Sequence, residues 1–300
     1  MTVTLGAKDT IEKLKSGQSY IDAFNDLTNW LAEYKQMAKI IHPDVCHEPG
    51  AKDALTKLNQ WKEELEKGKI HYDDAGTVTF KILNCSIEGN QPVLQQSLNN
   101  FNKLKLFKEK IDIDFQRYIP NKALLTPNND KSNLDLSLTN RCIPISSIGI
   151  LPQGHVNWIL SRMLEFIGYI HKKSYVHAGI NPDSVYVEPK NHGINVISFY
   201  HMAEVNKKLS TASGKWIYMY PDHIKTKKIA TADIDIELCK RTAVWLLGDK
   251  SGIGTCLRKT HNTAFLDFIN KKHDDPIEAF FDYRKMLENN FERKFIPLHI

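Results

Sequence analysis

The sequence has no long apolar run and no paired cysteines. Its longest apolar stretches, such as AVWLLG at 243–248, fall far short of the roughly 18 residues that span a bilayer. The N-terminus shows no basic segment followed by an apolar one, which is the pattern of a secretory signal. The five cysteines form no C-x-x-C pair, so neither a disulfide framework nor a zinc site is predicted; they stand at positions 46, 85, 142, 239 and 256. We therefore expect a cytoplasmic protein with no membrane partner and no metal.

The sequence also lacks a strong basic patch. The formal net charge of +5 is spread along the 300 residues. The most basic run, IKTKKIA at 224–230, has no interleaved aromatic side chains of the kind that stack on nucleic-acid bases. We expect this run to be a solvated loop, and we expect no nucleic-acid partner. A hydrophobic content of 42% is ordinary for packed cores, and the length allows two domains.

Helical periodicity dominates the N-terminal part of the chain. Apolar side chains recur at three- and four-residue steps on one predicted helix face, at Trp30, Leu31, Tyr34, Met37, Ala38 and Ile41. Thr28 is the expected N-cap of that helix, and Pro43 is expected to end it. A second helix, with Gly68 just past its end, is indicated by Ala54, Leu55, Leu58, Trp61 and Leu65. Two amphipathic helices therefore flank the loop HPDVCHEPG at 42–50.

This arrangement resembles the J domain of Hsp70 co-chaperones, the DnaJ-like proteins. EYKQMAKIIHPD at 33–44 resembles the family's helix II running into its HPD motif, and LTKLNQW at 55–61 resembles its helix III. YDDAG at 72–76 is similar to the Y-D-x-x-G that often follows. The resemblance implies that the HPD motif, here His42-Pro43-Asp44, stimulates ATP hydrolysis by an Hsp70 partner.

The side chains of this loop suit recognition rather than catalysis. His42 can donate or accept a hydrogen bond and is expected to be half-buried, and Asp44 offers a carboxylate that can pair with an arginine. In the family, helix II carries a dense basic face for docking on Hsp70. Here only Lys35 and Lys39 lie beside Glu33, so electrostatic steering should be weak. The alternative is that His42 and Asp44 only cap the ends of the two helices.

The pattern then changes to that of β-structure. TVTFKILNCSIEG at 77–89 alternates and is rich in Val, Ile, Phe and Thr, which predicts strands with a turn near Glu88-Gly89. PVLQQSLNNFNKLKLF at 92–107 predicts a helix. The polar stretch TPNNDKSN at 126–133 separates further short apolar runs. We expect a small sheet with one helix.

The second half of the chain resembles the large lobe of a protein kinase. Residues 151–205 contain a helix ending in YIHKKSYVH, the loop YVHAGINPDSVYV at 175–187, which is similar to a catalytic loop, and two short strands. SGKWIYMYPD at 213–222 is similar to the end of an activation segment, and Asp233 stands where the family anchors its catalytic loop from a central helix. The resemblance implies a bilobal fold, with a small β-rich lobe before a larger helical lobe.

The residues that would catalyse phosphoryl transfer are missing from this loop. In the family's H-R-D-L-x-x-x-N pattern His177 is kept, but the Arg position is Ala178, the catalytic-base position is Gly179 and the metal-binding Asn position is Ser184. No G-x-G-x-x-G precedes the lobe. Phosphoryl transfer depends on metal ions and on a positioned base, whose help alone is worth about 10²–10⁴ in rate, so we expect no enzymatic activity.

The second metal-binding motif is also degenerate. In D-F-G, Phe199 is kept, but the Asp is replaced by Ser198 and the Gly by Tyr200. Lys81 and Asp183 are the candidates for residual nucleotide binding. The alternatives are that Lys81 simply faces solvent from a strand and that Asp183 caps or pairs locally. No cofactor is expected.

The retained residues correspond to packing and anchoring positions of the kinase core. His177 and Phe199 are expected to stack within the core. Asp222 stands at the acidic position of the A-P-E tail, and Arg284 or Arg293 is its expected partner. Framework residues are therefore kept where catalytic ones are lost.

The sequence thus predicts an α+β protein with a helical J-like domain at 1–75, a β-rich small lobe at 76–150 and a helical large lobe at 151–300. We expect a non-catalytic interaction protein, a pseudokinase whose J-like domain recruits or stimulates an Hsp70 chaperone toward a bound protein client. One alternative is a degenerate scaffold, inhibitor or adaptor that binds another protein without chaperone activity. The other is an atypical kinase or nucleotide-binding sensor.

Overall fold

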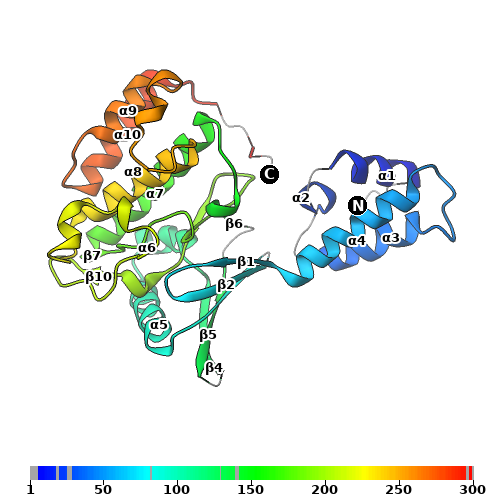
Figure 1. The fold of residues 1–300 in the computed structure, drawn as a ribbon, viewed down its shortest axis with the longest axis horizontal. Coiled ribbons are helices and arrows are strands. Elements are labelled where there is room, and N and C mark those ends of the chain that lie inside the picture. Colours follow the sequence, from blue (N-terminus) through cyan, green and yellow to red (C-terminus); the bar gives the residue numbers. More distant parts are fainter. Residues whose placement is uncertain are drawn as a thin grey trace. The chain divides into compact units, whose positions relative to one another are not determined.

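The computed structural model describes residues 6–17, 20–25, 29–81, 83–128, 130–138, 142–294 and 297–298. The chain is a mixed α+β protein with a helical N-terminal segment and antiparallel sheets. Its contacts divide it into two compact units (Figure 1). The first unit is formed mainly by Met1–Ile70 with Thr79–Leu83, and the second by His71–Val78 and Asn84–His299.

The first unit is a small helical cluster. Its helices are α1 (Ala7–Ser16), α2 (Tyr20–Ala23), α3 (Trp30–Ile41) and α4 (Ala51–Lys67). The two helices predicted from periodicity are confirmed as α3 and α4, and Gly68 ends α4 with a φ of 74° that favours glycine. The expected N-cap Thr28 lies outside the described residues. Leu31, one of the residues of the predicted apolar face of α3, is 42% exposed.

The core of the first unit is drawn from all four helices. Its fully buried members include Leu14 of α1, Ala23 of α2, Ile41 of α3 and Leu58 of α4. Trp61 and Leu65 continue the buried stripe of α4 at helical spacing. Apolar burial on this scale is the main source of stability for such a small helical unit.

A five-stranded sheet follows, in the order β1-β2-β3-β5-β4. The strands are β1 (Lys69–Tyr72), β2 (Gly76–Lys81), β3 (Asn84–Gly89), β4 (Lys122–Asn128) and β5 (Lys131–Ser137). Strand β5 pairs antiparallel with both β3 and β4. The polar stretch at 126–133 is the end of the β4–β5 hairpin rather than a loop between separate elements, apart from Asn129, which lies outside the described residues.

Two boundaries differ from the sequence expectation. The helical region ends at Lys67 rather than near residue 75, because β1 starts at Lys69 and residues 73–75 form the turn into β2. The turn expected near Glu88-Gly89 is wrong, since both residues lie inside β3 and pair with Asn133 and Ser132. A glycine is required there because a Cβ on Gly89 would collide with the carbonyl oxygen of Ala75.

The helix predicted at 92–107 is confirmed as α5 (Gln91–Lys105), which contacts β3, β4 and β5. A short helix α6 (Lys110–Phe115) and a 3₁₀ turn η1 (Gln116–Tyr118) follow it. Neither was predicted. The stretch is too short to show a helical period, so sequence reasoning had no signal for it.

The rest of the second unit is mainly helical (Figure 1). Its helices are α7 (Gln153–Lys172), α8 (Ala232–Leu246), α9 (Thr263–Asn270) and α10 (Pro276–Asn290). Helix α7 is the central element, and it packs against both α8 and α10. Its buried side is almost continuous from Val156 to Ile170.

Short strands and 3₁₀ turns complete this part of the chain. The strands are β6 (Ile143–Pro144), β7 (Tyr175–Val176), β8 (Val185–Val187), β9 (Ile194–Val196) and β10 (Ala203–Glu204), arranged as β6-β8-β9 and β10-β7. The 3₁₀ turns are η2 (Ile145–Ser147), η3 (Phe199–His201), η4 (Ile217–Met219), η5 (Asp222–Lys225) and η6 (Thr255–Lys259). Two short strands are present as expected, but β8 forms the last three residues of the 175–187 stretch and only β9 follows it. Every helix in the described ranges is too short or too polar to span a membrane.

Candidate functional site

The first candidate site is the loop that leaves α3. His42 is the C-cap residue, and with φ −62° and ψ 134° it turns the chain out of the helix just before Pro43. The Nδ1 atom of His42 lies 3.3 Å from the backbone N–H of Asp44 and 3.4 Å from its carboxylate. The His42 side chain is 50% exposed and that of Asp44 is 84% exposed. Both side chains are therefore presented to solvent next to each other.

The contacts of this loop do not support a purely capping role. The side chains of His42 and Asp44 interact with each other, and α4 begins only at Ala51, with Gly50 as its N-cap residue. The carbonyl oxygen of His42 accepts hydrogen bonds from the backbone N–H groups of Val45 and Cys46. Helix α3 therefore ends in a backbone turn. Neither the His42 nor the Asp44 side chain caps a helix end.

Two lysines extend this exposed site along α3. Lys35, Lys39 and His42 are spaced by four and three residues, which places them on one side of the helix. Lys35 and Lys39 are both exposed. The neighbouring Glu33 is turned to the α2 side, where its carboxylate accepts the backbone N–H of Asn25 at 2.7 Å. The row that leads to His42 is therefore positive, although it contains only two lysines.

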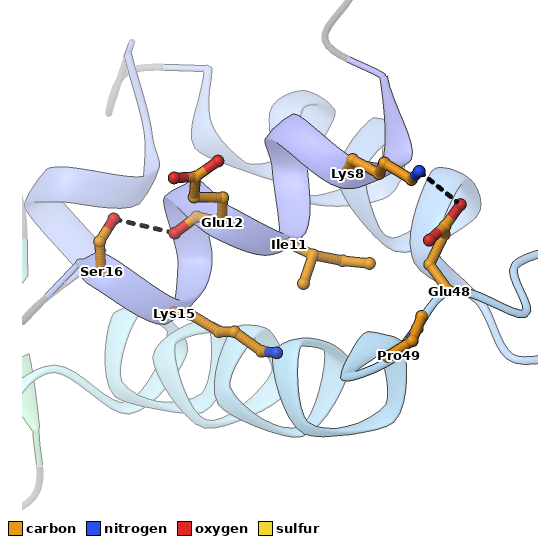
Figure 2. A pocket seen from close by; sticks show the side chains of 7 residues that line it. All are labelled: Lys8, Ile11, Glu12, Lys15, Ser16, Glu48 and Pro49. Carbon is orange, nitrogen blue, oxygen red and sulfur yellow. Dashed lines mark hydrogen bonds and ion pairs between the residues drawn. The ribbon is translucent and has the colours of Figure 1, made fainter.

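Helix α1 supports the far end of the same loop (Figure 2). Lys8 forms an ion pair with Glu48 at 3.6 Å, and an open hollow of about 540 Å³ lies between α1 and Pro49. In Figure 2 the side chains of Ile11 and Lys15 project from α1 toward the start of α4. These contacts restrain residues 48–49 and leave the His42 end of the loop open.

The second candidate site is the loop of the second unit that resembles a kinase catalytic loop. Asp235 of α8 anchors it: its two carboxylate oxygens accept the backbone N–H groups of His177 at 2.8 Å and Ala178 at 2.7 Å. The same carboxylate contacts Nε2 of His171 at 2.8 Å. The expectation that Asp233 anchors the loop is wrong, because Asp233 faces His223 at 3.5 Å instead.

Hydrogen bonds within the loop involve both Gly179 and Ser184, the positions that the resemblance aligns with catalytic residues. The hydroxyl of Ser184 donates to the carbonyl oxygen of Gly179 at 2.6 Å and accepts the backbone N–H of Asn181 at 3.0 Å. A Cβ on Gly179 would lie only 2.8 Å from Cδ2 of His201, so the space for a catalytic carboxylate is already filled. Both Ser184 and His201 are fully buried.

His177 and Phe199 pack into a buried aromatic cluster. Their rings are 5.4 Å apart, with Phe166 next to His177 at 5.9 Å and Phe101 of α5 next to Phe199 at 5.9 Å. Burial lowers the pKa of His177 to about 4. The side-chain amide of Asn100 donates to the carbonyl oxygen of Phe199 at 2.8 Å. The rings of His177 and Phe199 meet edge-to-face at 72° within this cluster.

The β1–β2 turn brings two carboxylates onto this site, which sequence reasoning missed. Asp73 accepts hydrogen bonds from the hydroxyls of Ser198 at 3.3 Å and Tyr200 at 3.2 Å. Burial raises the pKa of Asp73 despite the backbone N–H groups of Ala75 and Gly76 that it accepts. Tyr200 is 2% exposed. The D-x-x-G spacing is a turn signal that could have located these carboxylates.

Asp74 binds the backbone of residues 214–215. Its carboxylate accepts the backbone N–H groups of Gly214 at 2.8 Å and Lys215 at 3.3 Å. Partial burial opposes ionisation, but hydrogen bonds from His201 and Ser213 prevail and lower the pKa of Asp74 to about 2. The turn is therefore fastened to residues 198–215 through both of its carboxylates.

The two candidate nucleotide-binding residues lie in different units. Asp183 is buried, and its carboxylate accepts hydrogen bonds from Lys215 at 2.5 Å and Trp216 at 2.8 Å, so its local pairing is satisfied. Lys81 is exposed at the end of β2 and belongs to the first unit. The strand directly before α5 is β3, which contains no lysine.

One further expectation concerns a charge pair. Asp222 was expected to pair with Arg284 or Arg293, but it pairs with Lys225 at 2.8 Å, and Arg284 contacts Glu288 at 3.5 Å. Among the residues that the structure describes, no three His, Cys, Asp or Glu side chains are grouped in a way that could hold a metal ion.

Comparison with known proteins gives no family for this chain: no family model matches it, and neither does any curated protein. The resemblances to the J domain and to the protein kinases therefore stay predictions.

Proposed function

We propose that this chain is a non-catalytic interaction protein. Its first unit recruits or stimulates an Hsp70-type ATPase through His42-Pro43-Asp44, and its second unit, a pseudokinase, binds a protein client. The observation that carries the proposal is the exposed pair of His42 and Asp44 at the end of α3, in line with Lys35 and Lys39. An imidazole and a carboxylate held 3.4 Å apart can engage a cationic and polar surface on a partner.

The geometry of the second unit supports a role without phosphoryl transfer. The carboxylates of Asp73 and Asp74 are engaged by hydrogen bonds from the 198–215 segment, so they serve this packing rather than a metal ion. Asp183 is already neutralised by Lys215, and Gly179 has no room for a side chain. An enzyme that transfers phosphate needs positive charge and metal ligands at these positions. The nucleotide-sensor alternative is therefore the less favoured one.

An adaptor or inhibitor without chaperone activity is the second candidate. It is favoured by the small number of cations on α3, since Lys35 and Lys39 are the two exposed lysines in line with His42 within that helix. Attraction between oppositely charged surfaces raises association rates, so a sparse positive row predicts slow or weak docking.

The test is the steady-state ATPase rate of an Hsp70 with and without the full chain. The wild type should accelerate hydrolysis, and His42→Gln should abolish the acceleration because the imidazole is removed from an exposed position without any change in the core. His47→Gln is the matched control, since it makes the same change at an exposed position of the same loop. The co-chaperone proposal would be contradicted if the wild type did not accelerate hydrolysis, or if both variants lost the acceleration equally.

A further inference from the structure

Two lysine-rich segments of the second unit are joined by backbone hydrogen bonds. The N–H of Asn206 donates to the carbonyl oxygen of Ala230, the N–H of Leu209 to that of Lys228, and the N–H of Ala230 to that of Lys207, each at 2.8 Å. Lys208 and Ile229 form the β-bridge between them. Residues separated by about twenty positions in the sequence are thereby placed side by side.

This pairing creates what we call the lysine surface, which consists of Lys207, Lys208, Lys227 and Lys228. All four side chains are exposed. Among the described residues no acidic group forms an ion pair with any of them, whereas Lys225 nearby is paired with Asp222 at 2.8 Å. Four ammonium groups without counter-charges on neighbouring backbone positions create a concentrated positive potential.

The backbone of Lys228 shows that a side chain is kept there at a conformational cost. Its φ is +47°, in the left-handed region that glycine and asparagine adopt most readily. Asn206, at the other turn of the same pairing, has a φ of +64° and is of the favoured type. Glycine would be less strained at position 228 than the lysine that stands there.

We infer that the lysine surface binds an acidic, Asp/Glu-rich segment of a partner protein. The paired segments contain no Phe, Tyr or Trp on which a nucleic-acid base could stack. Leu209 and Ile224 are buried and Ile229 is half-buried, so these segments present no exposed large apolar side chain to a lipid surface. They contain no arginine, the residue best suited to bidentate phosphate recognition. Unpaired lysine charges complement carboxylates along an extended chain.

The inference deepens the proposed function, because it gives the chemistry of the client that the second unit would bind. It does not depend on the His42 loop. The His42→Gln variant should bind an acidic peptide as the wild type does, so loss of Hsp70 stimulation and loss of peptide binding are separate outcomes.

The experiment is fluorescence anisotropy of the full chain with a labelled peptide of alternating Glu and Ser. Binding should weaken about tenfold between roughly 50 mM and 200 mM salt, because exposed charges are screened over shorter distances at higher salt. The triple variant Lys207→Glu, Lys208→Glu, Lys227→Glu should weaken binding by at least about tenfold. The control triple, with the same charge change at exposed lysines elsewhere in the unit, is Lys190→Glu, Lys259→Glu, Lys285→Glu.

The control triple should change the affinity by no more than about twofold, as expected for charges distant from the site. A uridine oligonucleotide and phosphatidylserine vesicles are the competing probes. No binding of the peptide, equal losses in the two triples, or tighter binding of the oligonucleotide or the vesicles would overturn the inference.

Lys228→Gly tests the same surface without adding repulsion. Glycine relieves the left-handed backbone, so the melting temperature should rise while peptide affinity falls about threefold through the loss of one charge. These opposite signs distinguish a binding role from a structural one. A higher melting temperature with unchanged affinity would overturn the inference.

Discussion

Single residues decide how the 177–184 loop is held. Asp235 accepts two backbone N–H groups from this loop, and Ser184 closes it by donating to Gly179. Both residues are fully buried, and each of these hydrogen bonds satisfies a backbone group that has no access to water. The polar groups of the loop therefore stabilise its backbone conformation.

Replacing Asp235 by alanine should destabilise the second unit by about 3 kcal/mol, because it leaves the N–H groups of His177 and Ala178 buried without partners. Asp233→Ala, two residues earlier on α8, is the control and should cost less than about 1 kcal/mol, since that carboxylate is partly exposed. Urea unfolding measures both. Equal effects of the two substitutions would contradict the assignment of Asp235 as the anchor.

At the scale of elements, the β1–β2 turn acts as a fastener between the sheet and the residues around η3. Its two aspartates reach Ser198, Tyr200, Gly214 and Lys215. Helix α5 holds the same region from its own side, with Gln96 donating to the carbonyl oxygen of Tyr200 at 2.8 Å. Elements far apart in the sequence thus converge on one short segment.

The fastening by Asp74 should depend on pH. Its pKa in the folded chain is lowered from the usual 3.8 to about 2, so its ionised form stabilises the fold fully above the unfolded pKa. The contribution, about 1–2 kcal/mol after allowance for partial exposure, should be lost as pH falls from about 4 to 2. Thermal unfolding of wild type and Asp74→Asn should therefore converge over that range. Parallel curves from pH 5 downward would rule out this role.

At the scale of the whole molecule, the chain contains two units with separate cores. The core of the first unit is built from residues between Ile11 and Leu65. The second unit has its own buried helix pair, α7 and α8. Units with closed cores of their own generally unfold as separate cooperative transitions.

Leu58→Ala should destabilise the first unit by about 2–5 kcal/mol, because a fully buried leucine leaves a cavity in a small core. Leu246→Ala is the matched change at a fully buried position of α8 in the second unit. Hydrogen exchange read separately over the two units should show each substitution loosening only its own unit. Loss of protection across both units from either change would show that they unfold as one.

The sequence was sufficient to predict a helix where a long periodic apolar pattern is followed by a residue that ends helices. Helices α3 and α4 follow from apolar spacing, Pro43 and Gly68, and α5 from a run of similar length. It was misleading where a residue had two physical uses. Glycine is typical of turns, but Gly89 lies in a strand where two backbones approach closely. Asp233 and Asp235 are the same residue type and differ only in their angular position on α8.

By itself the sequence determined the long periodic helices, the position of the His42-Pro43-Asp44 loop and the absence of a side chain at Gly179, because these depend on residue type and on spacing within a few turns. Tertiary structure alone decided which groups meet over long separations. It placed Asp73 on Tyr200 and joined Lys207 and Lys208 to Lys227 and Lys228. Such contacts depend on how distant backbone segments pair and pack, and this is not encoded in any short stretch of residues.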